Sequence, residues 1–187
     1  MPESLIRMNR MDQALHRMKL RYTPMVNSRL STLWETWEYD DSPGSYHGNT
    51  GYNHGWGGGP LILLSEYVAG MKPDMNQANS FIIRPRLAGM DHVMAGMMTV
   101  TGMLEMLAEV TADTLHLTVS LPKNCTATLC IPRLQATGSF IYCNNRKWIR
   151  NGKVIEVQEG IEYLHSDEAY DYLKVRSGNY TFMSARE

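Results

Sequence analysis

The stretch TLHLTVSLP, residues 114–122, alternates apolar residues with polar or small ones and decides the class of fold. Successive side chains of an extended strand point to opposite faces of a sheet, so the leucines and the valine of this stretch share one face. A period of two is typical of a strand that is buried on one side. We therefore predict a β-strand here, with its apolar face in the core.

The same pattern recurs in short runs that turn residues separate. These runs are FIIRPRL (81–87), TATLCIP (126–132), FIYCN (140–144), KVIEVQEG (153–160), YLKVRSG (172–178) and NYTFMS (179–184). Short strands at this spacing favour an antiparallel β-sandwich. The stretch MAGMMTVTGMLEMLAEV (94–110) is rich in helix formers. We interpret it as a hairpin that turns near Gly102, because a long helix between these strands would interrupt the sheet.

The N-terminal part has a helical pattern instead. Apolar residues in steps of three and four share one helical face, and they are Met8, Met11, Leu15, Met18, Tyr22 and Met25. We expect a short first helix to end near Asn9, Asp12 to cap a longer second helix, and Pro24 to mark its far end. A further helix is predicted in PLILLSEYVAG (60–70), started by its proline and stopped by its glycine.

Together these patterns predict an α+β protein with two parts. Residues 1–75 are expected to hold the helices and a long loop, and residues 76–187 are expected to form the antiparallel β-sandwich. The change in character falls near residues 73–79.

Composition limits the function classes. The chain has 187 residues, 43% of them hydrophobic, and a net charge of -1 from 18 Lys+Arg and 19 Asp+Glu. This indicates a folded globular protein, with no block of like charges for nucleic acid and no apolar run long enough to span a membrane. The first residues do not resemble a secretion signal. Localisation stays open between the periplasm and the cytoplasm of a bacterium. The three cysteines, Cys125, Cys130 and Cys143, are interpreted as buried free thiols.

The loop STLWETWEYDDSPGSYHGNTGYNHGWGGGP (31–60) is the candidate functional segment. Glu35 is flanked by Trp34 and Trp37. A carboxylate beside aromatic rings suits a sugar site, because a ring face packs on C–H groups and an apolar wall tunes the carboxyl group. The alternative is a tryptophan pair packed in the core with Glu35 on an exposed edge. The local sequence alone slightly favours that alternative.

Metal and nucleotide binding find little support in this loop. The spacing of His47, His54, Asp40 and Asp41 matches no recognised metal motif. His54 is better interpreted as a hydrogen-bond donor in a polar pocket, or as a residue that packs the loop. GWGGGP lacks the strand and the Lys-Ser/Thr of a phosphate loop, so its glycines more plausibly let the backbone approach a neighbour closely. No cofactor is expected.

Four motifs in a fixed order carry a family resemblance. These are STLWETW (31–37), GYNHGWGGG (51–59), EYVAGMKPD (66–74) and FIIRPRLAG (81–89). Their order resembles the closing part of the (α/α)6 six-hairpin barrel in glycoside hydrolase family 78, the bacterial α-L-rhamnosidases. LHLTVSLPKNCTATLCIP (115–132) and VRSGNYTF (175–182) are similar to the β-sandwich that follows this barrel. The resemblance covers nearly the whole chain.

The resemblance implies roles for residues of the loop. Glu35 would be the general base of an inverting hydrolysis, His54 would bind the sugar, and Trp34 and Trp37 would line or support the pocket. The substrate would be an α-linked L-rhamnose in a glycan or glycoside. Inverting enzymes also need a general acid about 6.5–9.5 Å from the base. In this family the acid lies upstream, so the chain is expected to need the upstream part of the barrel as a partner and to be inactive alone.

Two further expectations concern partners. The alternative function is a non-catalytic β-sandwich that braces the barrel or binds glycan. Only Phe140, Tyr142 and Trp148 lie near one another as possible sugar-stacking rings, so bracing is favoured. The apolar helical stripe would lose its barrel neighbours, and we expect two chains to pair these helices as a homodimer.

Overall fold

The computed structural model describes residues 2–30, 32–35, 51–111, 113–133, 139–150 and 152–186. The chain divides into two compact units, Met1–Leu64 (unit 1) and Ser65–Glu187 (unit 2). This division falls before the boundary predicted after residue 75. Helices come first and strands follow, so the predicted α+β class is confirmed, with most of the regular structure in strands.

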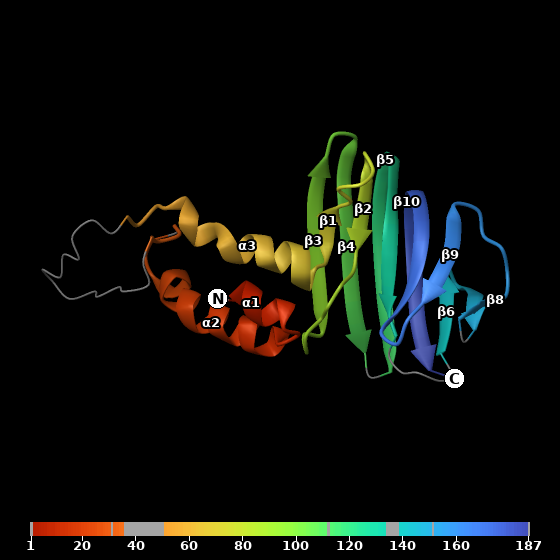
Figure 1. The fold of residues 1–187 in the computed structure, drawn as a ribbon, viewed down its shortest axis with the longest axis horizontal. Helices are drawn as coiled ribbons and strands as arrows, with labels where there is room; N and C mark the ends of the chain where they lie inside the picture. The colour runs from red at the N-terminus through yellow and green to blue at the C-terminus, as the bar shows by residue number, and fades with distance from the viewer. Residues whose placement is uncertain are drawn as a thin grey trace, which may run out of the picture. The chain divides into compact units, whose positions relative to one another are not determined.

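Unit 1 contains short helices. They are α1 (Pro2–Arg7), α2 (Met11–Asn27), the 3-10 turn η1 (Gly55–Gly58) and α3 (Gly59–Leu63), shown in Figure 1. The predicted break near Asn9 is confirmed. Asn9 has a φ of 59°, a left-handed conformation that asparagine tolerates, and the N–H of Arg10 donates to the carbonyl of Leu5 at 2.8 Å. These contacts end α1 and turn the chain into α2.

Both predicted ends of α2 were wrong. Arg10 occupies the N-cap without a side-chain hydrogen bond, and Asp12 lies in the first turn, where its negative charge favours the positive end of the helix dipole. Pro24 lies inside the helix, which continues to Asn27. A proline removes one backbone N–H bond, here to the carbonyl of Leu20. The side chains of Leu20 and Pro24 are both exposed, so water can hydrate that carbonyl.

The predicted apolar stripe is only partly open to solvent. Met18 and Met25 are buried, and Met8 is exposed. Ala14 and Ile6 are buried as well, so α1 and α2 already share a small core within one chain.

The helix predicted at 60–70 is shorter than expected. α3 passes into a π-helical turn, η2 (Leu64–Val68), and the chain leaves it at Gly70. Gly70 has a φ of +68°, and a β-carbon there would lie 1.9 Å from the carbonyl oxygen of Arg84. The N–H of Arg84 donates to the Gly70 carbonyl at 2.9 Å, and the N–H of Arg86 donates to the Val68 carbonyl at 2.8 Å. Glycine is required here because two backbones meet.

The described residues of unit 2 form a ten-stranded sheet. Its strands are β1 (Met71–Pro73), β2 (Ser80–Ile83), β3 (His92–Thr99), β4 (Gly102–Thr111), β5 (Thr114–Pro132), β6 (Ser139–Cys143), β7 (Arg146–Arg150), β8 (Lys153–Val154), β9 (Ile161–Ser166) and β10 (Tyr170–Arg186). Figure 1 shows β5 and β10 in the middle of the sheet. The hairpin predicted at Gly102 is confirmed, because β3 and β4 pair from His92↔Glu109 to Thr99↔Gly102.

The two long strands explain why the predicted sandwich of separate sheets is not seen. β5 and β10 pair along nearly their whole length, with one irregularity between Arg176 and Gly178. The first half of β5 also pairs with β4, and its second half pairs with β2. β10 likewise pairs with β9 first and with β6 later. Hydrogen bonds therefore join both halves in one sheet, and the β2–β5 pair is parallel rather than antiparallel.

The core of unit 2 follows the predicted alternation. Leu115, Leu117, Val119 and Leu121 are all buried. Both halves of the sheet contribute to one hydrophobic cluster, whose largest members include Trp148 and Phe182. The prediction of buried free thiols is confirmed, because all three cysteines are buried and unpaired.

Candidate active site

Two extended segments of unit 1, residues 32–35 and 51–54, form the candidate site. The N–H of Glu35 donates to the carbonyl of Gly51 at 2.9 Å, and the N–H of His54 donates to the carbonyl of Leu33 at 2.8 Å. The Thr32 hydroxyl also donates to the carbonyl of Tyr52 in the second segment. This short ladder of hydrogen bonds holds together two segments that are separated in the sequence, since Glu35 and Gly51 are sixteen residues apart.

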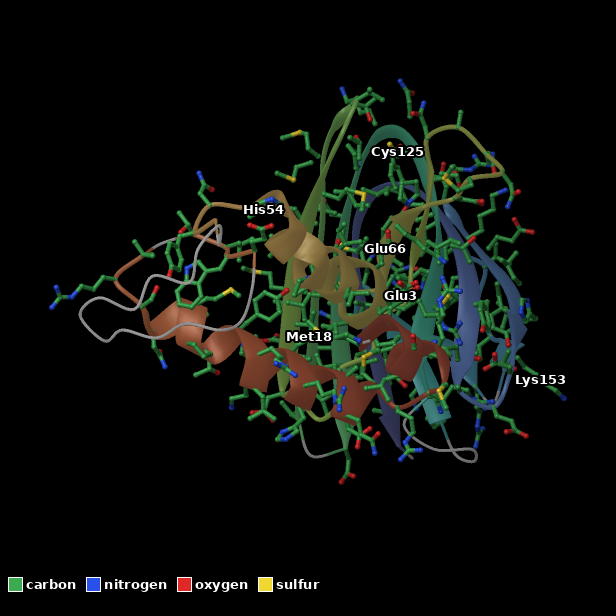
Figure 2. The ribbon with its side chains drawn as sticks, turned by 60° about the vertical axis from the view of Figure 1, so that its left-hand side comes forward. Glu3, Met18, His54, Glu66, Cys125 and Lys153 are labelled. Carbon is green, nitrogen blue, oxygen red and sulfur yellow. The ribbon has the colours of Figure 1, made fainter. Side chains whose placement is uncertain are left out.

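The ladder brings together the two residues predicted to act on the sugar. The N–H of Gly51 donates to Oε2 of Glu35 at 3.0 Å. A β-carbon at Gly51 would lie 3.4 Å from that same oxygen and 3.6 Å from Cδ2 of His54. Glu35 is exposed and His54 is half-buried, so both can meet a ligand from solvent. Figure 2 labels His54 where the chain runs toward α3.

Trp34 lies beneath this pair rather than on its surface. The Trp34 side chain is 1% exposed, and its ring meets that of Tyr52 edge to face, with centroids 5.6 Å apart. A buried ring of this size fixes the backbone beside Glu35. Trp37, the other predicted pocket residue, lies outside the described residues, as do Asp40, Asp41 and His47.

One glycine of GWGGGP, Gly57, allows the close backbone approach that was predicted for these glycines. A β-carbon at Gly57 would lie 2.7 Å from Cβ of Leu33 and 3.1 Å from the carbonyl oxygen of Trp34. η1 can therefore lie against the Glu35 segment only because this residue has no side chain. Gly51 and Tyr52 were not singled out from sequence, although both lie in the NTGYNH run next to His54.

The arrangement suits acid–base chemistry on a hydroxyl or a water. A solvent-accessible carboxylate with one oxygen held by a backbone N–H can accept a proton on its other oxygen, and a neighbouring imidazole can hydrogen-bond a sugar hydroxyl. No group of three His, Cys, Asp or Glu side chains in the described parts of the chain is placed to hold a metal ion. No described helix is long and apolar enough to span a membrane.

The aromatic row considered for glycan binding in the sheet unit is not an exposed surface. Trp148 is 1% exposed and Phe140 is also buried. Nζ of Lys147 lies 4.2 Å from the centroid of the Phe140 ring, and the guanidinium of Arg150 lies 5.2 Å from it. Because cations cover this ring and two of the three rings are buried, these residues do not form the exposed stacking row, which the sequence had supported only weakly.

Comparison with known proteins finds a family match over part of the chain. Residues 71–139 match the sequence model described as the bacterial alpha-L-rhamnosidase C-terminal domain. A comparison with curated proteins finds no significant match.

Solved structures match most of the chain. The alpha-L-rhamnosidase from Streptomyces avermitilis, complexed with L-rhamnose, matches 96% of it with a TM-score of 0.75 and 18% identity. The enzyme from Dictyoglumus thermophilum matches 88% with a TM-score of 0.71 and 22% identity. The enzyme from Aspergillus terreus matches 70% with a TM-score of 0.57 and 21% identity. The chain spans only 16–17% of the length of these structures.

The fold is thus similar to part of these alpha-L-rhamnosidase structures, with short helices followed by a mostly antiparallel sheet. Within that similarity, the sequence match to the model of the bacterial alpha-L-rhamnosidase C-terminal domain is limited to residues 71–139. Glu35 and His54 lie outside the matched segment.

Proposed function

We propose that the chain is the C-terminal part of an inverting glycoside hydrolase that releases α-linked L-rhamnose from glycans or glycosides. The observation that carries this proposal is the approach of the Glu35 carboxylate and the His54 ring to the same glycine, Gly51. The resemblance of the Glu35 and His54 motifs to family 78, together with the family match of the sheet unit, supports it.

In this mechanism Glu35 is the general base. Its carboxylate takes a proton from a water as the water oxygen attacks the anomeric carbon, and the Gly51 N–H keeps the carboxylate oriented. His54 donates a hydrogen bond to a sugar hydroxyl and so fixes the ring at the attacking distance. Trp34 supports the site from below, and Trp37 is proposed to line it.

The general acid is supplied by another part of the enzyme. A second carboxyl group about 6.5–9.5 Å from Glu35 has to protonate the leaving oxygen while water attacks the other face. We place it in the upstream part of the barrel, with the helices of unit 1 as the closing part of that barrel. The chain alone then lacks protonation of the leaving group, which contributes typically ~10²–10⁴-fold to rate.

The isolated chain is therefore expected to show no turnover of 4-nitrophenyl α-L-rhamnoside above the buffer rate. Release of nitrophenolate at pH 7 measures it. Clear turnover that Glu35→Gln abolishes would show that a described or neighbouring residue of this chain supplies the acid, and the proposed division of labour would be wrong.

In the full-length enzyme, Glu35→Gln keeps the shape of the side chain but removes the base. We expect kcat to fall ~10²–10⁴-fold while L-rhamnose binding stays within about threefold. His54→Ala should instead weaken rhamnose binding by about tenfold. Glu109→Gln, an exposed carboxylate on β4, is the matched control and should leave both quantities unchanged. Near-normal turnover by Glu35→Gln would contradict the assignment.

A second candidate function, in which the sheet unit is non-catalytic and braces the barrel, is favoured by one observation. The family match covers residues 71–139 and does not reach the Glu35 segment, as expected if the sheet unit only braces the barrel. In that case Glu35→Gln and Glu109→Gln would behave alike in the full-length enzyme.

The helices of unit 1 are proposed to have a partner surface. Leu20 of α2 is 61% exposed, and Leu61 and Ile62 of α3 are 66% and 60% exposed. We propose that the upstream barrel covers them in the complete enzyme, and that a second copy covers them in the isolated chain. Light scattering at micromolar concentration should give a dimer that Leu20→Gln shifts toward monomer. A strictly monomeric mass for the unchanged chain would exclude pairing.

A further inference from the structure

A cleft of about 310 Å³ lies in unit 2 and takes no part in the proposed hydrolysis. Its floor is the outward face of β1, β2, β5 and β10, and residues of η2 form one wall. Lys72, Ile82 and Thr128 are aligned across three neighbouring strands of that floor. Tyr172 lies beside Cys130 in the next row. The cleft is therefore built on rigid sheet structure.

Two arginines reach this cleft because of the alternation in FIIRPRL. Phe81, Ile83 and Pro85 are buried, so Ile82, Arg84 and Arg86 lie on the opposite face. The backbone N–H groups of both arginines bond to the chain at the end of η2, as described for Gly70. This pairing continues the sheet beyond β2 and holds the two guanidinium groups two residues apart on one face.

The cleft carries an excess of positive charge. Arg84, Arg86 and Lys72 line it together with the carboxylates of Glu66 and Asp74. In the described ranges no ion pair involves any of the three cations. Nε of Arg84 is buried without a hydrogen-bond partner among the described residues. Arg84 thus brings to the cleft a positive charge that no ion pair among the described residues neutralises, and this charge suits an anionic ligand.

Neighbouring aromatic side chains hold the cleft in shape. The guanidinium of Arg84 lies 4.3 Å from the centroid of the Tyr170 ring. The Tyr172 hydroxyl donates to Oδ2 of Asp167 at 2.7 Å, and its ring stacks on His165 with centroids 4.3 Å apart. Burial raises the pKa of the Cys130 thiol to about 11, so the thiol stays neutral at pH 7 and adds no negative charge to the floor.

From this geometry we propose that the cleft binds a sugar that carries a carboxylate, a uronic acid unit of a glycan. The arginines match a carboxylate, because guanidinium groups donate parallel hydrogen bonds to its two oxygens. The ring of Tyr172 suits the C–H face of a sugar. Glu66 and Asp74 can accept hydrogen bonds from the sugar hydroxyls. The volume lies at the small end of ligand pockets, which run from about 300 to 1,000 Å³, and so fits a single unit. This site lies in the other unit from Glu35 and His54 and needs neither.

Calorimetric titration of the full chain with three probes tests the class of ligand. The probes are sodium methyl β-D-glucuronide, methyl β-D-glucoside and sodium sulfate. We expect the glucuronide to bind at least about tenfold more tightly than either other probe, because only it offers both a carboxylate and a ring. Equal affinity for the neutral glucoside would overturn the role of the cations. Equal affinity for sulfate would leave only a general anion site and would also overturn the proposal, as would no binding of the glucuronide.

Matched variants locate the binding. Lys72→Gln and Arg86→Gln should each weaken glucuronide binding about tenfold. Their controls are Lys153→Gln, on β8 at the other end of the sheet path (Figure 2), and Arg176→Gln, on β10 outside the cleft. Equal losses in variants and controls would contradict the assignment. Circular dichroism checks that each variant is folded, and two independent positions keep the test valid if one fails. A negative result leaves the proposed hydrolase role of Glu35 unaffected.

Discussion

The two units of the chain bury their apolar residues very differently. Unit 2 has one continuous cluster to which both halves of the sheet contribute, and its side chains include fully buried Leu117 and Phe182. The buried apolar side chains described in unit 1 are few: Ile6, Ala14, Met18, Met25 and Trp34. Large apolar side chains of its helices stay exposed instead.

This difference distinguishes a unit with a large hydrophobic cluster from one whose exposed apolar side chains are proposed to meet neighbours. Hydrophobic burial contributes about 25 cal/mol per Å², so the unit with the larger buried cluster has its own driving force for folding. The candidate active site lies in the other unit, where a short backbone ladder and Trp34 fix Glu35 and His54 locally. The active site is thus proposed on the unit with fewer buried apolar side chains.

The sharpest test of this contrast compares two core truncations. Phe182→Ala should lower the free energy of unfolding of unit 2 by about 3–5 kcal/mol, because the side chain is fully buried in the large cluster. Met25→Ala, one of the few buried apolar side chains described in unit 1, should lower stability by about 2 kcal/mol. Urea unfolding followed by tryptophan fluorescence and circular dichroism measures both. Equal losses would show that the two cores are comparable.

Two glycine substitutions sharpen the comparison at the backbone. Gly70→Ala combines a left-handed φ with a collision against the Arg84 carbonyl, and should lower stability by roughly 2–4 kcal/mol. Gly59→Ala, at the start of α3, meets nothing within 4 Å and should be neutral or stabilising by up to about 1 kcal/mol. The melting temperatures of the two variants measure these changes in stability. A stable Gly70→Ala protein would show that the approach of η2 to the sheet can relax.

The smallest expected effect is a pair of opposite pH dependences within unit 2. Burial raises the pKa of Asp171 above its ordinary value of 3.8, despite Arg133 with its Nε 3.6 Å away. The folded state then holds the proton longer than the unfolded state. Asp171 therefore makes stability fall as pH rises from 3.8 through the raised pKa. The hydrogen bond from Tyr172 lowers the pKa of Asp167, which makes stability fall as pH drops below 3.8.

Replacing either aspartate with asparagine removes the contribution of that residue to the pH dependence of stability. Relative to the unchanged chain, Asp171→Asn should gain stability as pH rises above 3.8, whereas Asp167→Asn should gain relative stability as pH drops below 3.8. Urea midpoints measured at several pH values check the signs. Parallel slopes for the two variants would contradict the assigned causes.

Local patterns in the sequence were enough for several strands and one hairpin, although only Lys153–Val154 of the predicted run 153–160 is a strand and β7 and β9 were not predicted. The alternation in residues 114–122 gave the buried face of β5, and Gly102 marked the hairpin of β3 and β4, because side-chain parity and turn chemistry act over a few residues. The pairing of β5 with both β2 and β4 could not be found this way. It depends on a strand long enough to serve two halves of a sheet, which no short window reveals.

The candidate site was only partly predictable. The resemblance pointed to Glu35 and His54, and the structure brings them to the same glycine. Gly51 itself was missed, since its importance arises only when two segments pair. The cationic cleft was missed for a similar reason. Arg84 and Arg86 were visible as part of a strand, but Lys72 and Tyr172 join them only through the order of the strands.

The central position of β10 affects how the protein can be made. It is the last of the described strands to leave the ribosome, yet it pairs with β5, β6 and β9. During synthesis β5 therefore carries an open edge until residue 186 has been added. Open edges of nascent strands pair readily with strands of neighbouring chains. Soluble yield in the cell should thus depend on chaperones that shield β5 until translation of β10 is complete.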